Sequence, residues 1–132
     1  MREIKFRGIP TYGKDFVYGS LIININEAGR KEYLIKKHIG IIEIIPETLG
    51  QYTGLKDKNG VEIYEGDIVR TTSNELTGKW KHKIYKIEFK EINCVAGAKY
   101  MGFDFQFNVD EVEIIGNIYE NKELLKWVQF QS

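Results

Sequence analysis

The chain contains a single cysteine, Cys94, among its 132 residues, and its 19 basic and 19 acidic residues leave a formal net charge of zero. One cysteine cannot form an internal disulfide, which favours a reducing compartment. A neutral total excludes the strongly basic surface typical of many nucleic-acid-binding proteins. No apolar run approaches the roughly 18 residues that cross a bilayer, and Met1–Lys5 carries no apolar signal-peptide segment. We therefore expect a soluble cytoplasmic protein.

Side chains that bind soft metal ions are also scarce. They are His38, His82 and Cys94, and no two of them have the short spacing of a zinc-binding pair. No helix start beside Cys94 supplies the positive field that would activate its thiol as a nucleophile. The sequence thus predicts no metal, no other cofactor and no catalytic cysteine.

A length of 132 residues suits one domain, and we expect residues 1–132 to form it, because no linker, repeat or low-complexity tract divides the chain. The pattern of apolar residues predicts mainly strands. They are expected at 4–7, 16–24, 31–38, 39–45, 79–90, 103–109 and 112–119. Asn121 is placed to cap a terminal helix, with Leu124, Leu125 and Val128 as its apolar stripe. The expected fold class is a β-rich α+β protein.

The segment 46–69, PETLGQYTGLKDKNGVEIYEGDIV, concentrates residues with special backbone preferences. Asn59 and Gly60 predict a two-residue hairpin turn, because both tolerate the positive φ that such a turn needs. Glu65, Gly66 and Asp67 interrupt the next strand pattern and predict a sharp corner. Corners of this kind are common in small, strongly bent barrels.

This segment resembles the signature of the YopX-like family of phage and prophage proteins. Shorter stretches fit the same pattern at 5–8 (KFRG), 16–19 (FVYG) and 115–121 (IGNIYEN), followed by 123–125 (ELL). Phe16 stands where such proteins often have tryptophan, and Lys122 where they often have proline. The resemblance implies an SH3-like small barrel with additional N-terminal strands and a C-terminal helix. It implies a phage or prophage origin and brings no established activity, so no catalytic residue is transferred.

A basic and aromatic stretch favours nucleic-acid binding as one hypothesis. Lysines on one face of a strand meet phosphates while aromatic rings stack on bases. The candidate residues are Lys79, Trp80, Lys81, Lys83 and Lys86. The plainer interpretation is an edge strand whose lysines prevent pairing with other chains.

Acidic residues support a second, weaker hypothesis, a carboxylate-dependent enzyme. Glu47, Glu65 and Asp67 would have to line a cleft for acid–base chemistry. Their positions at backbone corners favour a structural role, in which a carboxylate accepts N–H bonds within a turn.

The preferred hypothesis is a non-enzymatic accessory protein that binds other proteins or assembles with itself. Aromatic residues concentrate at protein–protein interfaces. Trp127 and Phe130 of the expected terminal helix are the candidate interface residues. The partner is not specified by the sequence, and homo-oligomers fit this hypothesis as well as a second protein does.

Overall fold

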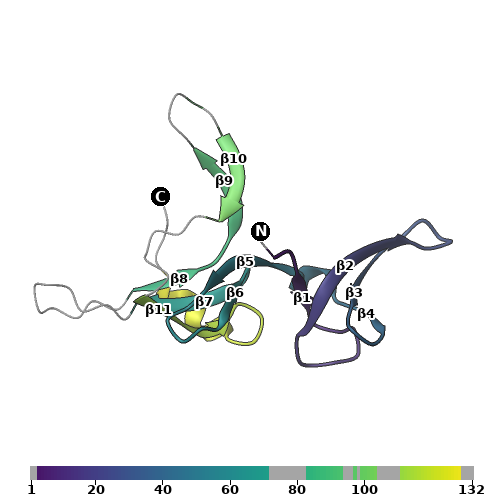
Figure 1. Ribbon diagram of the computed structural model, residues 1–132, viewed down its shortest axis with the longest axis horizontal. Helices are drawn as coiled ribbons and strands as arrows, with labels where there is room; N and C mark the ends of the chain where they lie inside the picture. Colours follow the sequence, from purple (N-terminus) through teal and green to yellow (C-terminus); the bar gives the residue numbers. More distant parts are fainter. Residues whose placement is uncertain (1–2, 72–82, 94–96, 98, 104–110, 129–132) are drawn as a thin grey trace, which may run out of the picture. The chain divides into compact units, whose positions relative to one another are not determined.

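The computed structural model describes residues 3–71, 83–93, 97, 99–103 and 111–128 (Figure 1). The chain forms two compact units, residues 1–54 and 55–132. Both are built from strands and short 3₁₀ helices, so the predicted β-rich class is confirmed for the described residues. The expectation of one domain over the whole chain stays a prediction.

The first unit is an antiparallel sheet with the strand order β4-β3-β2-β1-β5. Its elements are β1 (Phe6–Gly8), β2 (Val17–Ile25), β3 (Lys31–Lys36), β4 (Ile41–Glu43), the 3₁₀ helix η1 (Pro46–Thr48) and the start of β5 (Gly50–Lys56). Ile35, Ile44 and Tyr52 are buried and form its core.

Two glycines of the short signature stretches allow close approach within this sheet. A Cβ on Gly19 would overlap the backbone carbonyl oxygen of Lys36, and one on Gly8 would overlap the side chain of Ile44. A third motif residue, Phe16, lies under the guanidinium of Arg7, whose Cζ is 4.1 Å from the ring centroid. A phenylalanine therefore still provides the cation–π partner for a 5% exposed arginine.

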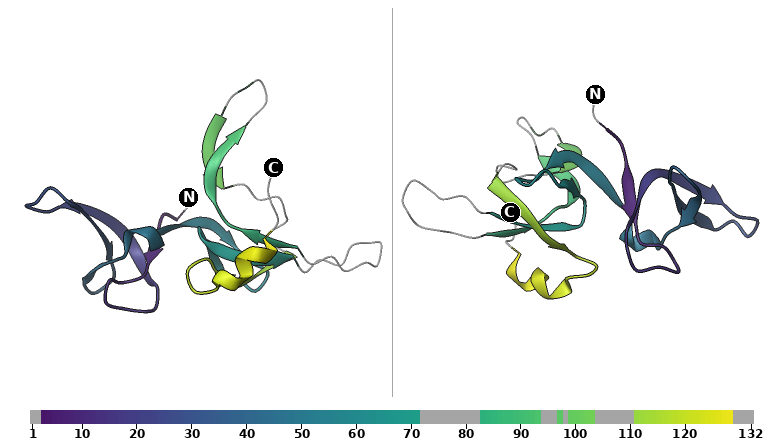
Figure 2. Two further views of the ribbon diagram at one scale, coloured as in Figure 1. Left: turned by 180° about the vertical axis from the view of Figure 1, so that it is seen from behind. Right: turned by 60° about the horizontal axis from the view of Figure 1, so that its bottom comes forward.

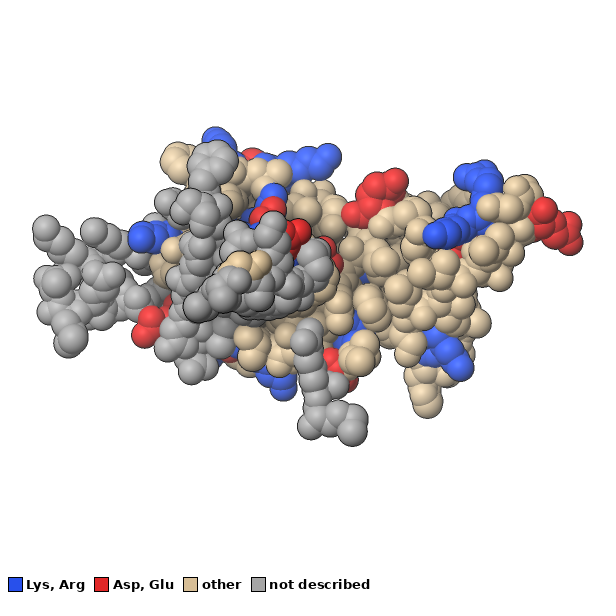
Figure 3. Space-filling model, turned by 90° about the horizontal axis from the view of Figure 1, so that it is seen from above, with Lys and Arg blue, Asp and Glu red and all other residues tan. Residues whose placement is uncertain are grey.

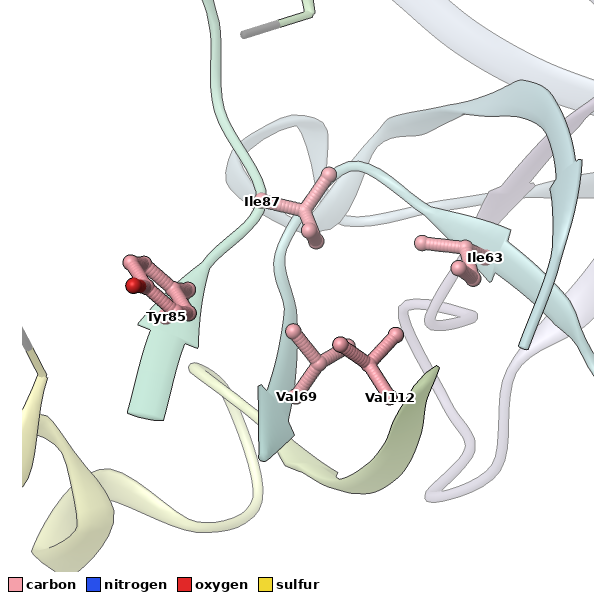
Figure 4. Close-up of a cluster of buried hydrophobic side chains, with 5 residues drawn as sticks. All are labelled: Ile63, Val69, Tyr85, Ile87 and Val112. Atoms are coloured by element: carbon pink, nitrogen blue, oxygen red, sulfur yellow. The ribbon is translucent and has the colours of Figure 1, made fainter. Parts of the chain in front are cut away.

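The second unit contains a three-stranded antiparallel sheet in the order β11-β7-β8 and an antiparallel pair of β9 and β10. Its strands are β6 (Glu62–Tyr64), β7 (Asp67–Thr71), β8 (Ile84–Lys86), β9 (Phe89–Asn93), β10 (Lys99–Phe103) and β11 (Val112–Asn117). β6, β7, β8 and β11 curl as a half-barrel around the buried side chains of Ile63, Val69, Tyr85, Ile87 and Val112 (Figure 4).

Asp57 ties the hairpin between β5 and β6 to the distant strand β11. Its Oδ1 accepts the backbone N–H groups of Asn59 and Val61, both at 2.9 Å, and its Oδ2 accepts that of Ile114 at 3.1 Å. The residue is only 6% exposed. A buried carboxylate is tolerated because these donors replace the water that it has lost.

The hairpin itself differs from the predicted two-residue turn. The N–H of Gly60 donates to the carbonyl of Asp57 at 3.0 Å, so the tight turn runs from Asp57 to Gly60, with Lys58 and Asn59 at its centre. Gly60 follows with φ of 79°. This is the three-residue loop with a left-handed glycine at its end. The prediction that Asn59 and Gly60 form the turn centre was therefore wrong by one residue.

The Glu65–Asp67 corner joins β6 to β7 as predicted. Gly66 has φ of 93°, and Asp67, which is 2% exposed, accepts the N–H of Tyr64 at 2.8 Å. A Cβ on Gly66 would lie 3.1 Å from the ring of Tyr119. The corner thus needs glycine both for its backbone conformation and for the neighbouring ring.

The predicted terminal helix is not confirmed as an α-helix. Residues Lys122–Trp127 form the 3₁₀ helix η4, and Asn121 makes no side-chain cap bond to it. Its Oδ1 instead accepts the N–H of Asn117 at 3.1 Å, which closes the turn after β11. The side chain is therefore already engaged with the preceding strand, and the cap that would begin an α-helix is missing.

Some predicted strands are shorter than expected or broken. Residues 39–45 contain only the three-residue strand β4, and the stretch 79–90 is split between β8 and the start of β9. The expected strand 103–109 overlaps the end of β10 at Phe103 alone, and its remaining residues lie outside the described part of the chain.

Replacing Asp57 tests the tie between hairpin and strand. Asp57→Ala leaves three backbone N–H groups without their acceptor, and we expect it to lower the free energy of unfolding by about 2–4 kcal/mol. Urea denaturation measures this loss. Asp15→Ala, at an exposed residue, is the control and should change the value by less than about 0.5 kcal/mol. Equal effects of the two substitutions would contradict the role of Asp57.

Gly66 and Gly60 both have a positive φ, but only at Gly66 does a neighbouring side chain lie close to where a Cβ would be. Substitutions at the two positions therefore distinguish the cost of the backbone conformation from the cost of a steric clash. Gly66→Ala forces a side chain into the left-handed region beside Tyr119, and we expect a loss of about 1–3 kcal/mol. Gly60→Asn should cost less than about 1 kcal/mol, because asparagine tolerates that region and nothing lies within 4 Å of a Cβ there. Thermal and urea unfolding of both variants measure the difference. A Gly60→Asn variant that is less stable than Gly66→Ala would refute this account.

Candidate interaction surface

A hairpin in the first unit extends beyond the strand beside it. β4 pairs with Leu34, Ile35 and Lys36 of β3 only, whereas β2 pairs with β3 from Lys36 back to Lys31. The part of this hairpin beyond β4, residues 23–33, is called the arm below (Figure 1 and Figure 2). The Tyr33 carbonyl still accepts the N–H of Ile44 at 2.9 Å, but in the described part of the chain no strand pairs with the outer edge of β3 at Lys31 and Glu32.

The arm carries isoleucines on a face that nothing in the first unit covers. In a strand, alternate side chains share a face, so Ile23 and Ile25 continue the face of Leu21. Toward the core this face is closed by Ile35, which is fully buried. Farther out, Ile23 is 53% exposed and Ile25 is 64% exposed. Because two consecutive large apolar side chains are exposed on one ordered face, we take the arm as the candidate interaction surface.

The turn of the arm is built by specific hydrogen bonds. Oδ1 of Asn26 accepts the N–H groups of Ala28 at 3.0 Å and Arg30 at 2.9 Å, and Gly29 follows with φ of 80°. Across the opposite face, the Asn24 amide donates to Glu32 at 3.0 Å. The isoleucines therefore project from a defined hairpin whose register is fixed.

The same turn device closes the hairpin at Asp57. In both hairpins an Asn or Asp oxygen accepts the N–H groups two and four residues later, and a glycine with positive φ lies three residues later. Asp57 has a second oxygen, which binds Ile114, whereas the amide nitrogen of Asn26 is no acceptor. The Asp57 hairpin is thereby anchored to another strand through this side chain.

An open apolar hollow lies in the same unit, at the opposite end of β3. It lies between β4 and the turn Pro10–Gly13, has a volume of about 490 Å³, and includes Tyr12, Ile41, Ile42 and Glu43 in its lining. The N–H of Thr11 donates to the Glu43 carbonyl at 3.1 Å and holds the turn against the strand. Tyr12 is fully exposed and Ile41 is 56% exposed, so two apolar side chains border the hollow without cover.

The candidate nucleic-acid residues are only partly described. Lys79, Trp80 and Lys81 lie outside the described residues. Lys83 is exposed, and the Lys86 ammonium forms an ion pair with Glu88 at 2.7 Å. The nucleic-acid-binding strand at 79–86 therefore stays a prediction.

The candidate interface residues of the C-terminal segment are also divided. Trp127 is 59% exposed and lies beside Lys126, whose Nζ is 5.3 Å from the ring centroid. Phe130 lies outside the described residues.

The acids of the enzyme hypothesis have different surroundings. Glu47 is exposed in η1, and Asp67 is buried and engaged by the turn backbone. Glu65 lines a hollow of about 290 Å³ together with Lys86, Glu88 and Tyr119. No group of three metal-binding side chains occurs among the described residues. In the part of the chain that the structure covers, no helix has the length and hydropathy to cross a membrane.

Known proteins include relatives of this chain. The family model of the YopX protein matches residues 5–126. The chain belongs to the YopX family. The crystal structure of protein EF1440 from Enterococcus faecalis is similar to this YopX chain, with 27% identity, a TM-score of 0.52, and coverage of 95% of this chain and 99% of that one. No curated protein matches the sequence.

The signature stretches of this YopX chain have a clear structural role. Gly8 and Gly19 permit close packing in the first unit, Gly66 faces Tyr119, and a Cβ on Gly116 would overlap the side chain of Asn121. These residues specify backbone geometry. The exposed isoleucines of the arm lie outside the quoted stretches, so the family resemblance did not identify them.

Stability measurements can verify that the arm isoleucines are surface residues. The variant Ile23→Thr/Ile25→Thr keeps β-branched side chains, and we expect its free energy of unfolding to fall by less than about 1 kcal/mol. Ile35→Thr, which places a hydroxyl in the core, should cost about 2–4 kcal/mol. Urea denaturation of the three proteins distinguishes the sites. A double variant as unstable as Ile35→Thr would show that the arm face is covered within the molecule.

Proposed function

We propose that this chain is a non-enzymatic accessory protein of a phage or prophage, acting in the bacterial cytoplasm by binding protein through the arm. The observation that carries this proposal is the exposure of Ile23 and Ile25 on an ordered hairpin. Membership of the YopX family supports the phage origin. Exposed apolar side chains on a defined face favour association with protein because their burial is the main favourable term in such interfaces.

The second unit is best suited to a scaffold role in this proposal, as an SH3-like barrel. Its buried acids, Asp57 and Asp67, accept backbone N–H groups. A carboxylate held in this way stabilises a turn and is poorly placed to exchange protons with a substrate. This use of the acids supports a non-catalytic function.

Capture from lysate of phage-infected cells, with the full chain as bait, tests the proposal. We expect the wild-type chain to retain protein that survives nuclease, and Ile23→Thr/Ile25→Thr to lose at least about 80% of it, because the variant removes the apolar contact. Val61→Thr, at a 51% exposed valine of the second unit, is the matched control and should retain it.

Two other results would overturn the proposal. Retention of only nuclease-sensitive material would transfer the function to nucleic acid and to the lysines at Lys83 and Lys86. Equal capture by the wild-type chain and the arm variant would show that the arm is not the binding surface.

A further inference from the structure

The arm and the hollow are two exposed apolar surfaces, one at each end of β3. Ile23 and Ile25 project from the arm, and the hollow at the other end of β3 is open and bordered by Tyr12 and Ile41. Lys31 at the arm and Lys36 beside β4 are five residues apart, which corresponds to about 17 Å along a strand. One copy of the rigid hairpin cannot place its own arm in its own hollow.

Residues of opposite charge border the arm and the hollow. Lys31 is directly across from Ile25 in the register of β2 and β3, so the cation borders the apolar face of the arm. Glu43 lines the hollow and shares a face of β4 with Ile41. Both Lys31 and Glu43 are exposed, and neither has an ion-pair partner among the described residues. In Figure 3 charged side chains of both signs lie toward the end of this unit, beside a wide uncharged surface.

On each of the two surfaces, a charged residue lies near an exposed isoleucine. On the arm, Ile25 has a cation as its cross-strand neighbour; at the hollow, Ile41 has an anion two residues along the strand. An arm seated in a hollow would bury Ile25 against Ile41 and bring the Lys31 ammonium toward the Glu43 carboxylate. Opposite charges at the edge of an apolar contact fix its register and exclude partners with the wrong charge.

We propose that the partner of the arm is a second copy of this chain, whose hollow between Pro10–Gly13 and β4 receives Ile23 and Ile25, with Lys31 paired to Glu43. This inference rests on the proposed protein-binding function and names its partner. The two surfaces differ, so the contact is heterologous, and repetition closes a ring or extends a filament.

The contact area sets the expected strength. The arm has three strand residues on each side, so one face of it is about 10 Å long and covers only roughly 100 Å², whereas a stable interface buries about 800 Å² on each partner. A single contact is therefore weak. Each copy makes two of them, one through its arm and one through its hollow, so association should rise steeply with concentration.

Charge reversal tests the pairing directly. Sedimentation velocity of the full chain between about 10 µM and 0.5 mM should show concentration-dependent association of the wild type. Lys31→Glu and Glu43→Lys alone should each weaken it about tenfold or more, because two like charges then meet. The double variant Lys31→Glu/Glu43→Lys should restore association to within about threefold of the wild type.

Matched controls exclude a general charge effect. Lys56→Glu/Glu123→Lys makes the same pair of reversals at exposed residues of the second unit and should associate as the wild type does. Ile25→Thr should abolish association without changing the circular dichroism spectrum.

The outcomes also separate this inference from the proposed function. A wild-type chain that stays monomeric to 0.5 mM, yet captures a different protein through its isoleucines, would overturn self-assembly and leave the protein-binding function standing. Association that survives Ile25→Thr would overturn the contact between arm and hollow, whereas the proposed function is decided by the capture experiment. Association that is lost in the single reversals and not restored in the double variant would overturn the Lys31–Glu43 pairing.

Discussion

The buried carboxylate of Asp57 is the interaction on which the second unit depends. Through it, a local hairpin turn and a strand more than fifty residues later share one side chain. The N–H of Lys58 adds a bond to the carbonyl of Val112 at 2.9 Å. Val112 and Ile63, one on each side of this tie, enter the same buried cluster. Loss of the carboxylate would leave the N–H groups of Asn59, Val61 and Ile114 without their acceptor and would release the hairpin from β11.

Residues that act through local backbone chemistry were the most predictable from sequence. The corner at Gly66 and the existence of a hairpin at Gly60 follow from the conformations that glycine permits. The position of the turn was misjudged because the Asn-Gly pair was given more weight than the acid three residues before the glycine. The same spacing occurs at Asn26 and Gly29, and the residue that accepts the turn N–H groups would have located both turns.

Features that depend on tertiary contacts could not be obtained in this way. The alternation of Ile23 and Ile25 predicts a shared face, but only the three-dimensional structure shows that this face is left exposed. Likewise, asparagine at position 121 predicts a helix cap, but its Oδ1 accepts the N–H of Asn117 instead. The candidate site therefore moved from the C-terminal aromatics to an arm that sequence reasoning had treated as ordinary strands.

The distance in sequence between paired strands determines when each unit can fold during translation. Every strand pairing of the first unit, including the arm, lies within residues 6–56, so this sheet can close while the rest of the chain is still being translated. Pairing of β7 with β11 must wait until Asn117 has emerged. Domains fold as their residues leave the ribosome. The arm is thus complete before the second unit acquires its core. Nascent chains translated from one messenger RNA therefore expose their apolar arms close to one another.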